Sequence, residues 1–244
     1  KLLIMKFTEY EMEVLQSFRE INPSIVFHPG NKVATISNNK NILAVADFPA
    51  FSFPKKAPIY DLGNLINSIK TLSYQNTADV EFQEQKVDIV NRGSRIKYYY
   101  AEERMVTQPP DAIQDLGEPV VSTKLDITHL IQIQKIASTY QLPDICFTGF
   151  EGKLTAVVTD KRNKTSNSLE IGLGSVDKDF CFCLKIENLS VIRPSSATYN
   201  PCTGYKLDIF GCKVAKFTGL ISKNAENSVG SLEYLIALEP DSEY

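Results

Sequence analysis

The feature that most constrains how this chain folds is a pattern that occurs twice, about half a chain apart. In the first copy a helical pattern ends at Pro23, and a short apolar run and a turn at Gly30 follow. In the second copy a helical pattern ends at Pro143, and a similar run and a turn at Gly152 follow. Because proline stops a helix and disfavours helical geometry in the residue before it, each copy predicts a helix that leads into a β-hairpin. Duplicated units of this kind associate side by side into curved, symmetric assemblies, so the repeat favours an assembly over an enzyme built around a pocket.

The length of 244 residues suits two domains, and the repeat favours that division over one large domain. Prolines and Gly117 interrupt the pattern between the copies, which predicts an extended connector. We therefore expect an α+β fold with an N-terminal domain over residues 1–101, a connector over 102–122 and a C-terminal domain over 123–244.

Apolar residues at spacings of three and four predict helices over residues 8–21, 62–72 and 126–140, and a short helical piece over 187–192. Runs between turn residues predict the strands. These are a weak strand over 1–7 and strands near 24–28, 32–38, 42–48, 79–84, 86–91, 95–101, 144–149, 153–160, 168–174, 179–185, 205–210, 213–219 and 231–239.

Composition narrows the class of protein. The net charge of −3 argues against a broadly basic nucleic-acid binder but allows one basic inner face. The five cysteines include Cys181 and Cys183, which alternate with phenylalanines on one face of a predicted strand, and there is no paired metal-ligand spacing. These observations predict buried reduced thiols and a reducing compartment. No apolar stretch approaches the length of a transmembrane helix.

The sequence offers almost nothing catalytic. It contains only two histidines, His28 and His129, and no Walker loop, nucleophile elbow, zinc-protease motif or dinucleotide fingerprint. We therefore expect a protein that is not an enzyme and that needs no metal and no cofactor.

Polar and basic side chains lie opposite the apolar stripes of the predicted helices, or beside those helices. One of them alone is more often just a solvated helix face, but together they suit a surface that meets a phosphate backbone loosely. The candidates are Arg19, Lys70, His129, Lys135, Lys185 and Arg193.

Three stretches then carry a resemblance to a known family. They are the start from Met5 to Asn22, the segment from Ile59 to Leu65, and the close from Leu235 to Ser242. In order and length they resemble the first strand and helix, the second helix, and the last strand and acidic tail of the sliding clamps of T-even-like tailed bacteriophages. These clamps are DNA polymerase processivity factors with the fold of proliferating cell nuclear antigen. The first helix here is strongly acidic and residues 161–164 are basic, and in both places the chain departs from the family pattern.

The resemblance implies a ring of duplicated clamp units, in which chains join head to tail as a homotrimer with helices lining the inside and antiparallel sheets outside. Such a ring encircles duplex DNA without sequence preference and tethers the replicative polymerase for processive synthesis, and the six basic candidates would face the DNA. A separate ATP-driven clamp loader, the C-terminal tail of the polymerase and, as in similar phage clamps, late-transcription factors are the implied partners. The implied location is the cytoplasm of the bacterial host cell.

Clamps of this family take short hydrophobic peptides into a pocket beside the connector. Apolar residues in the otherwise polar connector, together with the last strand, are the candidates for that pocket. They are Ile113, Leu116, Val120, Val121, Leu238 and Pro240. An equally simple interpretation is that these side chains pin the connector onto the sheet.

Two other functions remain open on the sequence. One is a non-replicative structural ring or tail component of a phage, built from the same duplication. The other is a small-molecule enzyme on an α+β fold, which would gather its polar groups in one cleft instead of along the helices.

Overall fold

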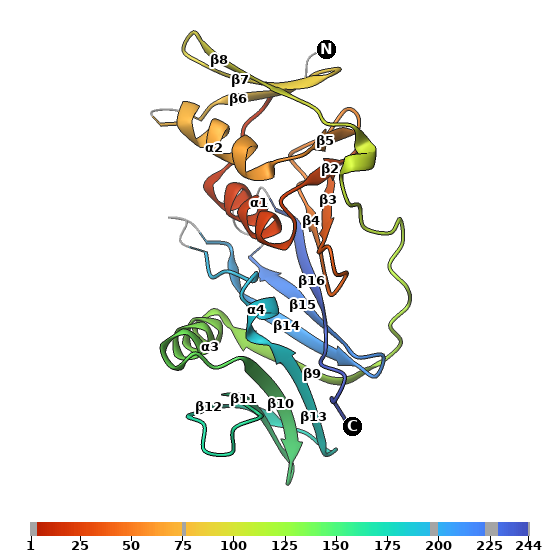
Figure 1. Cartoon of the computed structure of the whole chain (residues 1–244), viewed down its shortest axis with the longest axis vertical. Coiled ribbons are helices and arrows are strands. Elements are labelled where there is room, and N and C mark those ends of the chain that lie inside the picture. Colours follow the sequence, from red (N-terminus) through yellow and green to blue (C-terminus); the bar gives the residue numbers. More distant parts are fainter. Residues whose placement is uncertain (1–3, 75–76, 196–199, 223–228, 244) are drawn as a thin grey trace. The chain divides into compact units, whose positions relative to one another are not determined.

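The computed structural model of this chain describes residues 4–74, 77–195, 200–222 and 229–243. It divides into two compact units (Figure 1). Unit 1 comprises Lys1–Asp111, Ser195–Pro201 and Lys223–Leu232, and unit 2 comprises Ala112–Pro194, Cys202–Ser222 and Glu233–Tyr244. No helix in the described residues is long and apolar enough to cross a membrane.

Unit 1 alternates helices with short antiparallel strands. Its elements are β1 (Ile4–Met5), α1 (Glu9–Ile21), β2 (Ile25–Phe27), β3 (Lys32–Ile36), β4 (Ile42–Asp47), β5 (Ala57–Ile59), α2 (Leu62–Leu72), β6 (Asp79–Phe82), β7 (Lys86–Asn91), β8 (Ser94–Tyr99) and the 3-10 turn η1 (Glu103–Met105). One sheet has the order β1-β6-β7-β8, β2 pairs with β5, and β3 pairs with β4.

The helices of unit 1 begin where the sequence supplies caps. Thr8 accepts the backbone N–H of Glu11, and the Glu11 carboxylate accepts the backbone N–H of Thr8 at 2.7 Å, which together form a capping box. At the start of α2, Asp61 accepts the backbone N–H of Asn64 at 2.9 Å. These local hydrogen bonds explain why the helix starts could be predicted from sequence.

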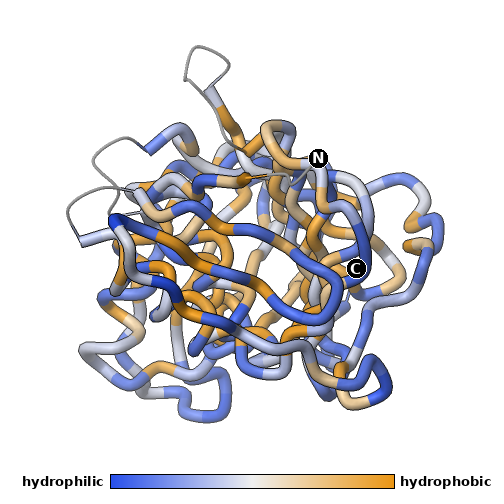
Figure 2. The backbone as a smooth tube through the Cα atoms, turned by 90° about the horizontal axis from the view of Figure 1, so that it is seen from above, coloured by the Kyte–Doolittle hydropathy of each residue, from blue (hydrophilic) through white to orange (hydrophobic). Residues whose placement is uncertain are grey.

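Unit 2 repeats the plan with longer strands and a much shorter second helix. Its elements are β9 (Pro119–Asp126), α3 (Ile127–Tyr140), β10 (Asp144–Phe150), β11 (Lys153–Thr159), β12 (Leu169–Ser175), β13 (Phe180–Lys185), α4 (Ile186–Leu189), β14 (Cys202–Phe210), β15 (Val214–Ile221) and β16 (Ser231–Ala237), which enters unit 2 at Glu233. One sheet has the order β12-β11-β10-β13, and β16, β15, β14 and β9 neighbour one another in that order. Hydrophilic and hydrophobic segments follow one another along the backbone (Figure 2). Along β11, buried residues alternate with more exposed ones, as expected for a sheet with one buried face.

The same backbone hydrogen bond marks the repeat in both units. In unit 1 the N–H of Leu62, the first residue of α2, donates to the carbonyl of Pro23 at 2.7 Å. In unit 2 the N–H of Ile186, the first residue of α4, donates to the carbonyl of Pro143 at 2.9 Å. In each unit, the proline that follows the first helix therefore anchors the start of the second helix. The two units thus share this backbone hydrogen bond as well as the sequence pattern.

The structure also departs from the sequence-based expectations. Strand β5 was not predicted, and β9 begins at Pro119, inside the segment expected to be connector. The prediction of buried reduced thiols is wrong for Cys146 and Cys183, which form a disulfide between β10 and β13, and for Cys181 and Cys212, which are exposed. Cys202 is buried and is not part of a disulfide. The sequence pattern gave no sign of this bond because the two cysteines become opposite each other only through strand pairing.

Candidate functional site

The outward faces of α1 and α2 carry two of the basic candidates. The Lys70 ammonium donates to the Gln16 side-chain carbonyl at 3.0 Å, so the exposed surfaces of the two helices are joined there. Arg19 is also exposed and lies against the first turn of α2, where a Cβ at Gly63 would come within 2.6 Å of its Nε. Glycine at position 63 therefore leaves room for the Arg19 side chain between the helices.

The acidic residues of α1 dilute this positive charge. Arg19 lies 3.4 Å from the Glu20 carboxylate, and both side chains are exposed, so the pair adds little stability. The two helices carry four glutamates against Arg19 and Lys70, so this face has no excess of positive charge, although its cations are accessible.

Helix α3 presents the corresponding surface of unit 2. Gln132, Lys135 and Thr139 are exposed along it, and they lie opposite the buried stripe of Leu130, Ile133 and Ala137. Lys135 is therefore placed on a solvated helix face, as the sequence pattern predicts.

His129 has a different environment from Lys135. It lies three residues after the helix N-cap Asp126, the position that Glu11 takes in α1, and it is only half-exposed. Its Nδ1 is buried and finds no hydrogen-bond partner in the part of the chain that the structure describes. Sequence periodicity placed His129 on the polar side, but it could not reveal this partial burial.

Lys185 and Arg193 flank α4 and differ from each other. Arg193 is exposed after the helix. The Lys185 ammonium lies 2.6 Å from the buried Asp144 carboxylate and 3.6 Å from Glu239. The hydrogen bond that Lys185 donates to Asp144 raises the pKa of Lys185 above its ordinary value, so the lysine stays charged, but the carboxylates neutralise its field.

The six candidates for a peptide pocket have unequal exposure. Val121 and Leu238 are buried, Leu116 and Val120 are half-buried, and Ile113 and Pro240 are exposed. Val120 and Val121 belong to strand β9, where Val121 pairs with Ile209 of β14. The valines therefore lie on the sheet, and the accessible apolar groups of this set are Ile113 and Pro240.

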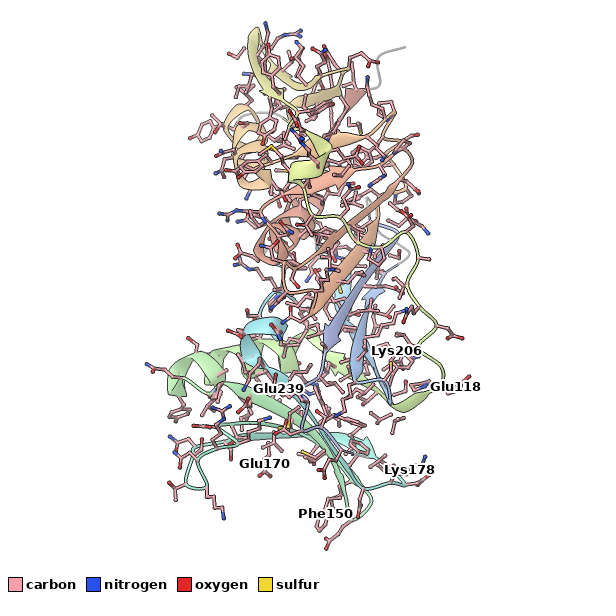
Figure 3. All side chains as sticks on the ribbon, turned by 45° about the vertical axis from the view of Figure 1, so that its right-hand side comes forward. Glu118, Phe150, Glu170, Lys178, Lys206 and Glu239 are labelled. Atoms are coloured by element: carbon pink, nitrogen blue, oxygen red, sulfur yellow. A yellow bond between two sulfur atoms is a disulfide. The ribbon has the colours of Figure 1, made fainter. Side chains whose placement is uncertain are left out.

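Pro240 lines a cavity of about 470 Å³ that the sequence did not indicate. The other lining residues are Cys146, Lys161, Arg162, Cys181, Cys183, Glu239 and Asp241. The tail after β16 forms one wall, because it is hydrogen-bonded to β13. The backbone N–H of Glu239 donates to the Cys183 carbonyl at 2.8 Å, and Cys181 and Glu243 exchange two backbone hydrogen bonds at 2.8 and 2.9 Å. Glu239 appears on this tail in Figure 3.

Lys161 fixes the tail from the other side of the cavity. Its ammonium donates to both carboxylate oxygens of Asp241, at 2.7 and 2.8 Å, and this contact holds the pKa of Asp241 below its ordinary value. In the basic segment 161–164, where the chain departs from the family pattern, the charge of Lys161 is therefore neutralised by the tail. Lys161 and Asp241 are 80 positions apart, so no local signal could have paired them.

Comparison with known proteins places this geometry in a family context. No family model matches the chain. The sliding clamp of Vibrio phage KVP40 is 29% identical over 242 residues, which cover 96% of this chain and 99% of that protein. This similarity supports the resemblance drawn from the sequence.

Solved structures with the same fold are far more distant in sequence. Proliferating cell nuclear antigen (PCNA) of A. fulgidus, bound to the C-terminal region of FEN-1, superposes with a TM-score of 0.71 at 11% identity over 100% of both chains. PCNA of Entamoeba histolytica gives 0.69 at 12% identity over 95% of both chains. The beta clamp of H. pylori gives 0.68 at 12% identity over 98% of this chain and 66% of the other. The α+β fold built of clamp units is therefore confirmed.

Proposed function

We propose that this chain is a sliding clamp, which encircles duplex DNA and tethers a replicative DNA polymerase for processive synthesis. The observation that carries the proposal is the duplicated unit, with the same proline-to-helix hydrogen bond in both copies. The near full-length similarity to a phage sliding clamp supports it. A separate ATP-driven loader would open the ring, and the chain itself would be no enzyme. The bacterial host cytoplasm, where phage DNA is copied, is the proposed location.

Ring formation requires complementary ends, and each unit offers a strand edge. In the described residues β8 is an edge of the unit 1 sheet and β12 is an edge of a unit 2 sheet. Exposed Arg95 and Lys97 lie on β8, and exposed Glu170 lies on β12. Edge strands of this length invite pairing with another chain. We propose that β8 of one chain pairs with β12 of the next, a heterologous contact that closes after three chains and six units.

Loose contact with DNA is what sliding needs. Lys70, Lys135 and Arg193 are exposed on or beside the helices. A few such cations release a few counterions, so the attraction is weak, non-specific and sensitive to salt. His129 and Lys185 would contribute less, since one is partly buried and the other is paired with carboxylates.

A processivity assay with the cognate polymerase and loader on a long primed template tests this function. The triple variant Lys70→Glu, Lys135→Glu, Arg193→Glu should shorten the products at least about tenfold at moderate salt, because it reverses the charge that would face the DNA. Native mass measurement should give a trimer for both proteins at micromolar concentration.

The matched control is Lys32→Glu, Lys153→Glu, Lys178→Glu, which changes the net charge equally at exposed positions on β3, β11 and the β12–β13 turn. It should leave product length unchanged. The proposal would be wrong if the variant with Lys70, Lys135 and Arg193 all changed to glutamate extended primers normally. It would also be wrong if the wild-type protein were a dimer at every concentration. A wild-type trimer without any effect on the polymerase would favour a structural ring of the phage instead.

Partner peptides are the second part of the proposal. PCNA of A. fulgidus was solved with the C-terminal region of FEN-1 bound, and we propose that the C-terminal tail of the polymerase binds this chain near the exposed Ile113 and Pro240. The loader and late-transcription factors are proposed to use the same surface. Modest, micromolar affinity would suit partners that exchange.

Binding of a labelled polymerase-tail peptide should weaken at least about tenfold in the Ile113→Ser, Pro240→Ser variant, because a large apolar contact is lost. We choose Ile113 and Pro240 for substitution and leave the buried Leu238 unchanged, since a polar side chain at position 238 would damage the fold. Tyr74→Ser is the control, because Tyr74 is 90% exposed and is far from this segment in sequence. Unchanged affinity of the Ile113→Ser, Pro240→Ser variant would show that the peptide binds to a different surface.

A further inference from the structure

Three cysteine sulfurs converge on one face of the sheet that contains β10 and β13. Cys146 of β10 lies directly opposite Cys183 of β13, and Cys181 lies two residues earlier on the same face of β13. The sulfur atoms of all three lie within 4.8 Å of one another, and those of Cys181 and Cys183 are 3.7 Å apart. Such convergence requires the strand pairing, because one residue of slip would turn Cys146 to the opposite face.

The cavity around this cluster offers sulfur and oxygen ligands together with basic side chains. All three cysteines line the cavity of about 470 Å³, with the carboxylate residues Glu239 and Asp241 and the basic residues Lys161 and Arg162. Three thiolates around a divalent cation carry one net negative charge, which the basic side chains would balance. Cys181 is exposed, so the cluster can be reached from solvent.

We propose that the reduced form of this cluster binds one soft divalent cation of the zinc class through the thiolates of Cys146, Cys181 and Cys183. A carboxylate of the tail, or water, would be the fourth ligand. This site is independent of the proposed function, because it concerns the isolated chain.

Formation of the metal site from the oxidised chain begins with reduction of the disulfide. A dithiol reductant supplies two electrons and two protons to the Cys146–Cys183 disulfide and becomes a disulfide itself. Each of the three thiols then loses its proton to solvent as its sulfur binds the cation. The oxidised chain keeps two of the three sulfurs in a covalent bond, so it cannot form the site.

Geometry favours the zinc class over harder ions. Tetrahedral zinc with Zn–S distances of about 2.3 Å places its sulfur ligands about 3.8 Å apart. The Cys181 and Cys183 sulfurs already have this spacing, at 3.7 Å. Reduction leaves the Cys146 side chain free to rotate to a similar separation. Thiolates select zinc and related soft ions, whereas magnesium prefers oxygen ligands.

Titration of the reduced chain, freed of reductant under anaerobic conditions, with Co²⁺ tests the proposal. We expect thiolate-to-metal charge-transfer absorption that saturates at one Co²⁺ per chain, is displaced by one Zn²⁺ and is insensitive to Mg²⁺. The disulfide form should show no such absorption.

Two serine variants separate this site from the other thiols. Cys181→Ser should weaken Co²⁺ binding at least about tenfold, because it removes one ligand at an exposed position. Cys212→Ser, at the other exposed free cysteine, should leave binding unchanged. Circular dichroism checks that both variants fold. A reduced wild-type chain that binds no Co²⁺, or a folded Cys181→Ser variant that binds it as tightly, would overturn the proposal and leave the Cys146–Cys183 pair as a structural bond only.

Discussion

The two units follow the same order of elements, yet different side chains hold them together. Unit 1 is built around a cluster of buried phenylalanines whose ring centroids lie 4.7 to 6.0 Å apart. Its members are Phe7, Phe27, Phe48, Phe51, Phe53 and Phe82. In unit 2 the sheet around β13 instead carries a disulfide, an aromatic pair and ion pairs to the tail.

This difference shows which parts of a duplicated unit depend on the backbone. The hydrogen bonds from Leu62 to Pro23 and from Ile186 to Pro143 are the same in both units, although α2 has 11 residues and α4 has 4. Backbone groups must be paired wherever they are buried, so the path of the chain is shared. The interior can be filled by any set of side chains with suitable volume, so the two cores differ.

The largest effect should come from the phenylalanine cluster. Phe53 is 1% exposed and contacts the rings of Phe27, Phe51 and Phe82, so Phe53→Ala should lower the free energy of unfolding by about 3–5 kcal/mol. Urea titration followed by circular dichroism measures it. Phe182→Ala in unit 2 should cost less, because Phe53 lies within a cluster of six rings, whereas Phe182 belongs to the ring pair that it forms with Phe180.

Phe150 provides the surface control for both variants. It is 64% exposed at the end of β10 (Figure 3), so Phe150→Ala should change stability by less than about 0.5 kcal/mol. Equal losses for Phe53→Ala and Phe182→Ala would show that the two units do not differ in what stabilises them.

The ion pair of unit 2 should give the next largest effect. Lys185→Met removes the partner of Asp144, whose side chain is 1% exposed, and leaves it with the backbone N–H of Lys161 at 3.2 Å. We expect a loss of about 2–3 kcal/mol, below the value for a fully buried pair because the Lys185 side chain is 25% exposed.

The double variant Asp144→Asn, Lys185→Met should recover part of that loss, since no unpaired charge remains. Lys178→Met, at an exposed lysine, is the control (Figure 3). If Lys185→Met instead leaves stability unchanged and shortens the products of the polymerase, the main role of Lys185 is to contact DNA and not to stabilise the fold through Asp144.

The smallest effect concerns how the first helix of each unit begins. Glu11 is fully buried in the capping box of α1, and burial raises its pKa from 4.5 to about 7, whereas the N-cap Asp126 of α3 makes no such bond. Between pH 4.5 and about pH 7, Glu11 binds more protons in the folded chain than in the unfolded chain. This contribution to stability is therefore present at pH 4.5 and below, and it is lost as the pH rises through about 7.

Glu11→Gln keeps the hydrogen-bonding shape of the capping box and cannot titrate. The wild type should lose on the order of 2 kcal/mol relative to this variant between pH 5 and pH 8, because the Thr8 hydrogen bonds offset part of the burial cost. Urea titrations of both proteins at the two pH values measure the difference. Parallel pH profiles would mean that Glu11 is ionised in the fold throughout this range.

Local signals account for the elements that the sequence predicted well. Apolar spacing placed α1, α2 and α3 within a residue or two of their bounds, and Pro23 and Pro143 marked where the first helix of each unit gives way to a strand. Strand β5 was missed because its three residues, Ala57–Ile59, contain a proline and are too short to show alternation. The α+β class and the duplication therefore followed from patterns that a few neighbouring residues carry.

For the candidate site the sequence could place a side chain on a helix face but could not name its partners. Lys70 and Lys135 lie on solvated faces as periodicity requires, whereas Lys185 meets Asp144 and Glu239, which are distant in sequence. The same limit hid the disulfide and the cavity, because Cys146, Cys183 and the tail meet only through strand register.

The sequence by itself therefore determined the repeat, the helices and most strands, since short-range spacing and proline geometry act within a few residues. Only the tertiary structure decided which charges are neutralised, which thiols converge and which apolar groups stay accessible. Those outcomes depend on strand register and on contacts across tens of residues, and a one-residue slip would change every one of them.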